Sequence, residues 1–222
     1  DINYTSGQVV AAGVNNLYSE ITWFYPTSSS SVVDRYASYN FAESAGIPGG
    51  VWMTGSLART GWIDSDVQPN PYAIEYLTSS DVSDTPLVYG NSEGITKMYK
   101  HEVGNNAVTS TGASTAIAAY VQSGDFDLDV DGDGEYIMKI RRFIPDFKTL
   151  TGTAKMSLNL KDYPADSDTP SGLSPISITS STTKVDVRAR ARLINLKVEN
   201  DAVNETWRFG TFRADIQPDG RR

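Results

Sequence analysis

Apolar and polar residues alternate with a period of two along most of the chain. The clearest case is 184–200 (KVDVRARARLINLKVEN), in which every second residue up to Ala191 is apolar. Successive side chains of a β-strand point to opposite faces, so this pattern predicts a strand with one buried face. The apolar positions change phase after Arg192, which predicts a β-bulge near Leu193.

The second half of the chain contains several such segments, with few aromatic residues and short turns between them. The predicted strands lie within 115–128, 135–147, 154–164, 184–200 and 207–218. Five or more long strands joined by short turns are typical of an antiparallel β-sandwich. We therefore expect a β-sandwich-like module at 111–222.

The first half is rich in aromatic residues and has shorter runs, separated by loops of Ser, Gly and Pro. Its predicted strand regions are 21–26, 34–41, 50–58 and 60–64. Residues 86–104 are expected to form a hairpin, with arms 87–90 and 95–102 around a turn at 91–94. Strand, turn and aromatic anchor in repetition are typical of propeller blades. We expect an all-β protein, with terminal blades of a β-propeller-like module at 1–110 followed by the sandwich-like module.

Aromatic side chains in the first half admit two interpretations. Large planar side chains fill the wedge between propeller blades, and this core role is favoured. The alternative is a sugar-binding platform exposed in a groove beside carboxylates. The residues concerned are Trp23, Tyr25, Tyr36, Tyr39, Trp52 and Trp62.

Composition narrows the class of protein. Hydrophobic residues make up 39% and charged residues 21%, which is typical of a globular chain rather than a disordered one. A net charge of −8 disfavours non-specific affinity for nucleic acid or anionic lipid. Cysteine is absent, and no apolar stretch approaches the roughly 18 residues of a membrane span. The chain begins with Asp1 rather than Met, so we expect further sequence upstream.

An acidic run at 125–136 (DFDLDVDGDGEY) has the spacing of a calcium-binding loop. Such a loop needs a bidentate Glu at its twelfth position, and the two possible registers place Met138 or Ile140 there. The run lies between two predicted strands, and its Asp-Gly-Asp-Gly tip tolerates positive φ. A solvated hairpin tip is therefore favoured, with a calcium site at 127–135 as the alternative.

Residues for catalysis are scarce. His101 is the only histidine, which excludes a multi-histidine metal site and leaves one possible member of a Ser-His-Asp triad. A structural hydrogen bond next to Glu102 is the ordinary explanation for it. No phosphate-binding glycine motif is present, and no carboxylate pair stands out for glycoside hydrolysis. We expect no enzyme activity, and no catalytic, cofactor or metal site.

Three arginines give the predicted strand at 184–200 a basic face. Arg188, Arg190 and Arg192 alternate with apolar residues, and in a strand they would stand about 6.6 Å apart. They could form a solvated face, or contact nucleic acid. They could also form a subunit interface with an acidic partner, because guanidinium groups pair well with carboxylates.

Four successive motifs carry a resemblance to a known family. They are WFYP…S…DRY..YNF, VW..G.LARTGWID, MYKHEVG and the terminal ADIQPDGRR. They resemble the propeller-bearing tail hub or nozzle proteins of short-tailed bacteriophages, which are related to packaged-DNA stabilisation proteins. The likeness runs from about residue 18 to the end of the chain. At 222 residues the chain has room for only the last blade or two of a propeller.

The resemblance implies a structural role in the virion. Proteins of this family assemble as a ring, commonly sixfold, below the portal and adaptor proteins. The ring surrounds the DNA channel, retains the packaged genome and lets the DNA pass without specific binding. We therefore expect a homo-oligomeric tail protein, assembled in the host cytoplasm, with no cofactor and no membrane segment. The alternatives are a glycan-binding or glycan-cleaving tail protein and a calcium-stabilised adhesion module.

Overall fold

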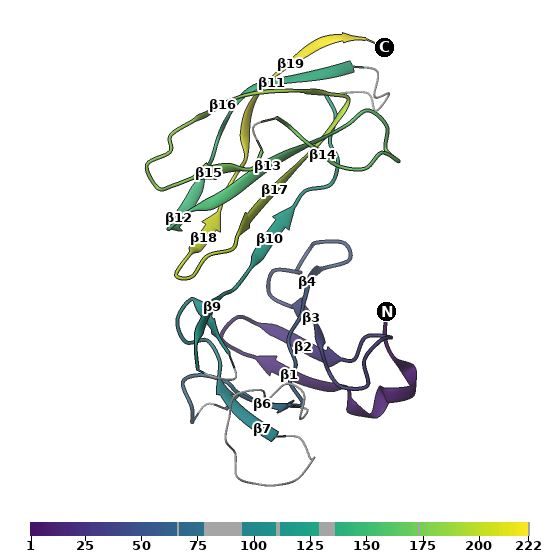
Figure 1. Cartoon of the computed structure of the whole chain (residues 1–222), viewed down its shortest axis with the longest axis vertical. Coiled ribbons are helices and arrows are strands. Elements are labelled where there is room, and N and C mark those ends of the chain that lie inside the picture. Colours follow the sequence, from purple (N-terminus) through teal and green to yellow (C-terminus); the bar gives the residue numbers. More distant parts are fainter. Residues whose placement is uncertain (66, 78–94, 110–111, 129–135, 173, 222) are drawn as a thin grey trace. The chain divides into compact units, whose positions relative to one another are not determined.

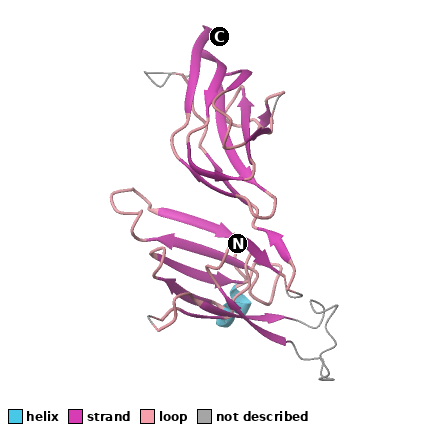
Figure 2. Cartoon of the chain, turned by 90° about the vertical axis from the view of Figure 1, so that its left-hand side faces the viewer, coloured by secondary structure: helices cyan, strands magenta, loops and turns pink. Residues whose placement is uncertain are grey.

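The computed structural model describes residues 1–65, 67–77, 95–109, 112–128, 136–172 and 174–221 (Figure 1). The backbone divides into two compact units, Asp1–Gly104 and Asn105–Arg222. This division falls slightly before the boundary expected between 110 and 111. Strands dominate both units, and the one helix of the described residues is the short 3-10 helix η1 at Tyr4–Val9 (Figure 2). The predicted all-β class is therefore confirmed.

The first unit contains a four-stranded antiparallel sheet in which consecutive strands are neighbours. Its order is β1-β2-β3-β4, with β1 at Ala11–Asn15, β2 at Glu20–Tyr25, β3 at Arg35–Asn40 and β4 at Val51–Gly55. β-Branched and aromatic residues, such as those of β2 (EITWFY), favour the extended backbone. A second sheet has the order β5-β6-β7, with β5 at Gly61–Ile63, β6 at Tyr72–Leu77 and β7 at Ile95–Lys100.

The hairpin predicted at 86–104 is only partly within the described residues. Its second arm forms β7, which pairs antiparallel with β6, so that Tyr72 lies opposite Lys100. The first arm at 87–90 and the turn at 91–94 lie outside the described residues. The sequence did not indicate β6 as the partner of β7, because β6 precedes a long intervening segment.

The second unit contains two larger antiparallel sheets and two small ones. Figure 1 shows β16, β11 and β19 together, and β17 between β10 and β13. One large sheet has the order β16-β11-β19, with strands at Val185–Ala191, Tyr136–Ile144 and Arg213–Arg221. The other has the order β10-β17-β13-β14, with β15 also paired to β13; these strands span Ala119–Gln122, Leu193–Asn200, Ala154–Lys161, Thr169–Pro170 and Ile176–Ile178. The small sheets are β12-β18 (Phe147–Thr151 and Thr206–Phe209) and β8-β9 (Asn106–Val108 and Ser114–Ala116).

Both large sheets contribute side chains to one hydrophobic core. β11 and β16 supply part of it, while β13, β15 and β17 supply the rest. The alternation predicted for β16 is present, since Val187, Ala189 and Ala191 are buried and the residues between them are exposed. Burial of one strand face against the other sheet is the main source of stability in such a unit.

The segment 184–200 forms two strands rather than one bulged strand. β16 ends at Ala191 and β17 begins at Leu193, and the two belong to different sheets. The phase change after Arg192 therefore marks the point at which the chain crosses from one sheet to the other. Strands that change sheets in this way form the corners of β structures.

The hairpin predicted around the acidic run is wrong. The strands on its two sides are β10 and β11, which belong to different sheets and do not pair with each other. The run instead begins by lying against β17, where Phe126 and Ile194 exchange backbone hydrogen bonds of 2.9 and 3.0 Å. Its tip at 129–135 lies outside the described residues.

Candidate functional site

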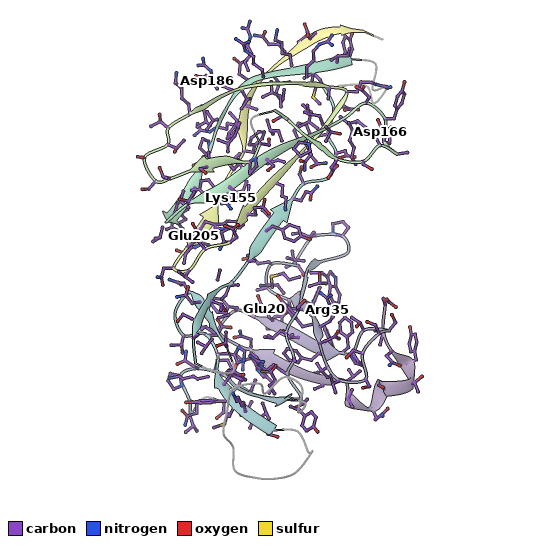
Figure 3. All side chains as sticks on the ribbon, viewed as in Figure 1. Glu20, Arg35, Lys155, Asp166, Asp186 and Glu205 are labelled. Carbon is purple, nitrogen blue, oxygen red and sulfur yellow. The ribbon has the colours of Figure 1, made fainter. Side chains whose placement is uncertain are left out.

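The face of sheet β16-β11-β19 that points away from the core gathers basic side chains. Arg188 and Arg190 project from β16 and are exposed. Lys139 of β11 lies directly opposite Arg190, and Asp186 lies near the start of β16, where Figure 3 labels it. Two of the three predicted interface arginines are therefore side by side on one sheet face.

A bulge in β11 adds two further arginines to this face. The pairing of β11 with β16 and with β19 shifts register between Ile140 and Arg142. The bulge interrupts the alternation, so the consecutive residues Arg141 and Arg142 are both exposed. The RR doublet inside an otherwise alternating strand was the sequence signal for this feature, and it was missed.

Acidic residues on the same face balance only part of this charge. Arg190 Nε lies 2.6 Å from Asp219 Oδ2, and Arg142 Nε lies 3.4 Å from Asp186 Oδ1. Within the described residues, Arg141 and Arg188 form no ion pair. We define the cationic face as six basic residues and four aspartates, including Asp146, which lies 3.5 Å from Arg213; its net charge is +2: Lys139, Arg141, Arg142, Arg188, Arg190, Arg213, Asp146, Asp186, Asp215 and Asp219. It stands out because the whole chain carries −8.

Arg192 does not continue this row. It lies at the corner between β16 and β17 and is half-buried. Its guanidinium carbon is 5.8 Å from the ring centroid of Tyr163, within reach of a cation–π interaction. Arg192 therefore lies at the corner between the two strands and not in one row with Arg188 and Arg190.

A buried amide organises the other large sheet. Asn195 of β17 is 2% exposed, and all four of its side-chain hydrogen-bonding positions are used. Its Nδ2 donates to Asp125 Oδ1 at 2.8 Å and to Asp168 Oδ1 at 2.9 Å. Its Oδ1 accepts from Gln122 Nε2 at 3.0 Å and from Asn159 Nδ2 at 2.9 Å.

Lys161 completes this network as the counter-ion of the two carboxylates. Its Nζ lies 2.9 Å from Asp125 Oδ2 and 3.2 Å from Asp168 Oδ1. The hydrogen bond from Asn195 contributes most to lowering the pKa of each aspartate, and Lys161 lowers both further. The first aspartate of the acidic run is therefore engaged within the chain.

The predicted alternative of a calcium site stays untested. Asp129, Asp131 and Asp133 lie outside the described residues. In the parts of the chain that the structure describes, no group of three or more His, Asp or Glu side chains is placed to hold a metal ion.

An open pocket of about 400 Å³ lies in the unit Asp1–Gly104, over one face of sheet β1-β2-β3-β4. We call it the acidic pocket, because two glutamates from distant parts of the chain line it. Figure 3 labels one of them, Glu20 on β2. The residues that matter for its chemistry are Asn15, Glu20, Tyr36, Trp62, His101 and Glu102.

One wall of the acidic pocket is the Trp62 ring, which lies directly on the backbone of Gly13. A Cβ atom at Gly13 would stand 2.3 Å from Trp62 Cγ, so only glycine permits this approach. Trp62 Nε1 donates to the Val14 carbonyl at 2.8 Å. The ring also stacks on Phe24 and lies against His101, with centroid distances of 5.9 and 4.7 Å.

His101 is held as a neutral hydrogen-bond acceptor. Arg59 Nε donates to His101 Nε2 at 2.9 Å, and Arg59 also pairs with Glu75 at 3.2 Å. Burial lowers the pKa of His101 to about 4, and the neighbouring guanidinium adds to this effect. The structural hydrogen bond expected of His101 is therefore present, and Arg59 is its donor.

Both glutamates of the acidic pocket have raised pKa values. Burial raises the pKa of Glu20, and the Glu102 carboxylate raises it further. Burial also raises the pKa of Glu102, although Asn15 Nδ2 donates to its Oε1 at 2.9 Å. Glu102 has a φ of 57°, in the left-handed region that few residues other than glycine adopt. The sequence could not indicate this pair, because Glu20 and Glu102 are far apart along the chain.

The opposite face of the same sheet carries aromatic side chains that are not core. Trp52 stacks on Trp23 with centroids 5.9 Å apart and contacts Tyr39 at 4.8 Å. Trp52 is 54% exposed, so the predicted core role is wrong for this residue. Among the described residues of this unit, Phe24, at 1% exposed, is the large aromatic side chain that is buried. Trp23, Tyr25, Tyr36, Tyr39 and Trp62 are half-buried.

No protein-family model matches the chain, and no curated protein matches it. The resemblance to phage tail proteins therefore stays a prediction from sequence motifs. Among the described residues, no helix is both long enough and apolar enough to cross a membrane.

Proposed function

We propose that this protein is a structural subunit of a short-tailed bacteriophage, in the tail hub or nozzle. It acts by assembling into a homo-oligomeric ring, sixfold by family resemblance, below the portal and adaptor proteins. The ring surrounds the DNA channel, retains the packaged genome and lets it pass, without chemistry of its own. The protein is assembled in the host cytoplasm and resides in the virion. The four sequence motifs support this proposal.

The finer fold assignment is part of the same proposal. Sheet β1-β2-β3-β4 is a four-stranded antiparallel meander, which is the architecture of one propeller blade. In the second unit, two antiparallel sheets share one core, as the sheets of a β-sandwich do. These features support a terminal blade at the start of the chain and a sandwich-like module after it.

The observation that carries an assembly role is the cationic face. A face of net +2 on a chain of net −8 leaves a large acidic surface elsewhere on each copy. Arg141 and Arg188 are the exposed guanidinium groups of this face for which the described residues offer no carboxylate. Guanidinium groups pair with carboxylates in a planar, bidentate geometry, so an acidic surface of a neighbouring subunit is a suitable partner.

The test is to neutralise the cationic face and measure assembly. In the variant R188Q/R190Q/R192Q the monomer should stay folded, because Arg188 has no ion pair in the described chain, the exposed pair of Arg190 contributes only about 0–1 kcal/mol, and Arg192 loses a single cation–π contact. Ring assembly should weaken, because loss of a charge pair buried in an interface costs about 2–5 kcal/mol. High salt should weaken wild-type assembly in the same way, since charges are screened within about 10 Å at 0.1 M. Native mass spectrometry and sedimentation across a salt series measure both effects.

Two further variants make this test sharper. Because Arg190 already binds Asp219 and Arg192 lies against Tyr163, the double variant R141Q/R188Q removes only the groups without an ion pair in the described chain. The matched control is K148Q/R208Q, which neutralises two exposed basic residues outside the cationic face. If both cationic-face variants form rings at low protein concentration as well as the wild type does, the arginines are only a solvated surface.

The exposed aromatic face of sheet β1-β2-β3-β4 favours a second candidate function, glycan binding. Exposed tryptophans can stack on sugar rings through their apolar surface, and Trp52 is exposed with Trp23 and Tyr39 beside it. Binding of host polysaccharide by the wild type, lost in W52A and retained in I63A, would support this function. Ile63 is a suitable control because it is also a large, exposed apolar residue in the same unit.

A further inference from the structure

We propose that the acidic pocket binds an alkylammonium group, a ligand that the assembly role does not require. The described residues of the pocket lining include the carboxylates of Glu20 and Glu102 and the side-chain amide of Asn15, but no lysine or arginine. Two carboxylates that accept hydrogen bonds from neutral groups, and that form no ion pair in the described chain, are therefore in one place. A cationic hydrogen-bond donor complements both.

Strand pairing brings two of these acceptors together. Asn15 at the end of β1 and Glu20 at the start of β2 lie directly opposite each other. Directly opposite residues of an antiparallel pair project from the same face of the sheet, with Cβ atoms about 4.5–5.5 Å apart. Glu102 joins them after β7, since its Oε1 accepts from Asn15 Nδ2 at 2.9 Å.

The Oδ1 atom of Asn15 accepts no hydrogen bond from the described residues. The residue is 4% exposed, and its Oδ1 is buried with no hydrogen-bond partner among the described residues. Reversing the amide would not help, because Nδ2 would then be unpaired and Oδ1 would face the carboxylate of Glu102. A buried polar atom without a partner destabilises the fold, so a bound donor that reaches it would be favoured.

Glu102 shows that the backbone is strained to hold this arrangement. Its φ of 57° lies in the left-handed region, and its carbonyl is fixed by Asn70 Nδ2 at 3.0 Å. Strained residues of this kind collect at binding sites, where the surrounding structure keeps them in place. Glu20 is half-buried and Glu102 is exposed, and the two carboxylates repel each other, so a bound cation would relieve the repulsion.

The charge of the pocket favours an ammonium group over a sugar. Trp62 Nε1 binds the Val14 carbonyl, and the hydroxyls of Thr22 and Ser38 bind each other at 2.9 Å, while the hydroxyls of Tyr18 and Tyr36 also line the pocket. A sugar is neutral, whereas an ammonium group carries a positive charge and three donors with no acceptor, which complements two carboxylates. The aromatic lining adds a favourable surface for a cation.

The same chemistry could come from two sources. A free polyamine could occupy the pocket, or a lysine side chain of another copy of the chain could insert into it. Both present a primary ammonium group on an alkyl stem, so the pocket chemistry does not separate them. The experiment therefore needs one arm for each source.

The first arm measures binding of n-butylammonium and spermidine to the chain of 222 residues by calorimetry. E20Q and E102Q should each weaken binding by at least about tenfold, because each removes a charged acceptor. E43Q is the matched control, since Glu43 is an exposed glutamate outside the pocket lining and its loss should leave affinity unchanged. Thermal unfolding without ligand shows whether each variant is folded, and E20Q should not be destabilised, because it removes a half-buried charge that lies near the Glu102 carboxylate.

The second arm measures self-association by sedimentation, with and without excess n-butylammonium. If a lysine of another copy is the ligand, then E20Q, E102Q and the competitor should each weaken association, whereas E43Q should not. This result is distinct from the cationic-face test, because the glutamates lie in the other unit. The proposal is wrong if both arms show no effect, if amine binding persists unchanged in E20Q and E102Q, or if Ca²⁺ binds and both amines do not.

Discussion

Gly13 is the residue on which one wall of the acidic pocket depends. We expect G13A to destabilise the protein by about 1–3 kcal/mol, because the added methyl group overlaps the Trp62 ring and forces it to move. Urea unfolding followed by tryptophan fluorescence measures this change. G61A is the control: its Cβ would meet no atom within 4 Å, and its effect should not exceed about 1 kcal/mol. Equal effects of the two substitutions would contradict the close contact.

His101 should make stability depend on pH. Its folded pKa of about 4 lies below the ordinary value of 6.5, so between these two pH values the unfolded chain binds a proton that the folded chain does not. Its contribution is complete above the ordinary pKa and is lost as pH falls toward the folded pKa. As the pH falls through this range, the difference in the free energy of unfolding between wild type and H101Q should therefore become smaller.

Comparison with H101Q is needed because other groups titrate nearby. The pKa values of Glu20 and Glu102 are raised, so their protonation favours the folded state as pH falls and opposes the effect of His101. Urea unfolding of wild type and H101Q at a series of pH values separates the two contributions. Parallel curves for the two proteins would show that His101 titrates normally.

Individual residues differ in how far the sequence could place them. The alternation in VDVRARA correctly predicted that Arg188 and Arg190 face solvent, because period two is a local property of a strand. Exposure of Trp52 could not be predicted, since tryptophan is equally suited to a core and to an exposed aromatic surface. The meeting of Glu20 with Glu102 depends on tertiary contacts that leave no local pattern.

Among the strands, β16 and β17 show what a phase change in the apolar pattern means. The sequence indicated the phase change at Arg192 but assigned it to a bulge within one strand. Alternation identifies the buried face of a strand but does not name its neighbours, so a bulge and a change of sheet look alike. The hairpin predicted at the acidic run was wrong for the same reason, because alternation does not identify the neighbours of a strand. β10 and β11 follow each other in the sequence but lie in different sheets.

The crossing between the two sheets needs the residue Arg192 as a spacer. β16 buries Val187, Ala189 and Ala191, whereas β17 buries Ile194 in the opposite phase. Deleting Arg192 shifts one strand by one position, which would turn its polar residues toward the core. We expect the deletion to abolish cooperative folding of Asn105–Arg222, as measured by near-UV circular dichroism and proteolysis. R192S keeps the spacing and should stay folded; a deletion variant that folds equally well would contradict this role.

At the scale of the whole molecule, the two units differ in how much they bury. The core of Asn105–Arg222 contains thirteen buried hydrophobic side chains, whereas the buried hydrophobic residues of Asp1–Gly104 in the described chain are Phe24, Val33 and Ala73. Stability grows with the apolar area removed from water, so the first unit should unfold at a lower temperature.

We therefore expect two unfolding transitions for the monomer in calorimetry. The fragment 105–222 should reproduce the higher transition on its own, because its core draws on strands of that unit alone. Assembly into a ring should raise the lower transition if the exposed aromatic face of the first unit becomes covered. A single transition, or a fragment 105–222 that does not fold, would show that the two units depend on each other.

Lys161 has a consequence for the conditions that the protein can tolerate. Its ammonium group lies between Asp125 and Asp168, in the position that a dissolved cation would otherwise occupy. A cation taken from solution is lost when its concentration falls or when a chelator competes for it, but a lysine is covalently part of the chain. This part of the fold therefore keeps its counter-ion at low salt and in the presence of a chelator, whatever metal ions surround the protein.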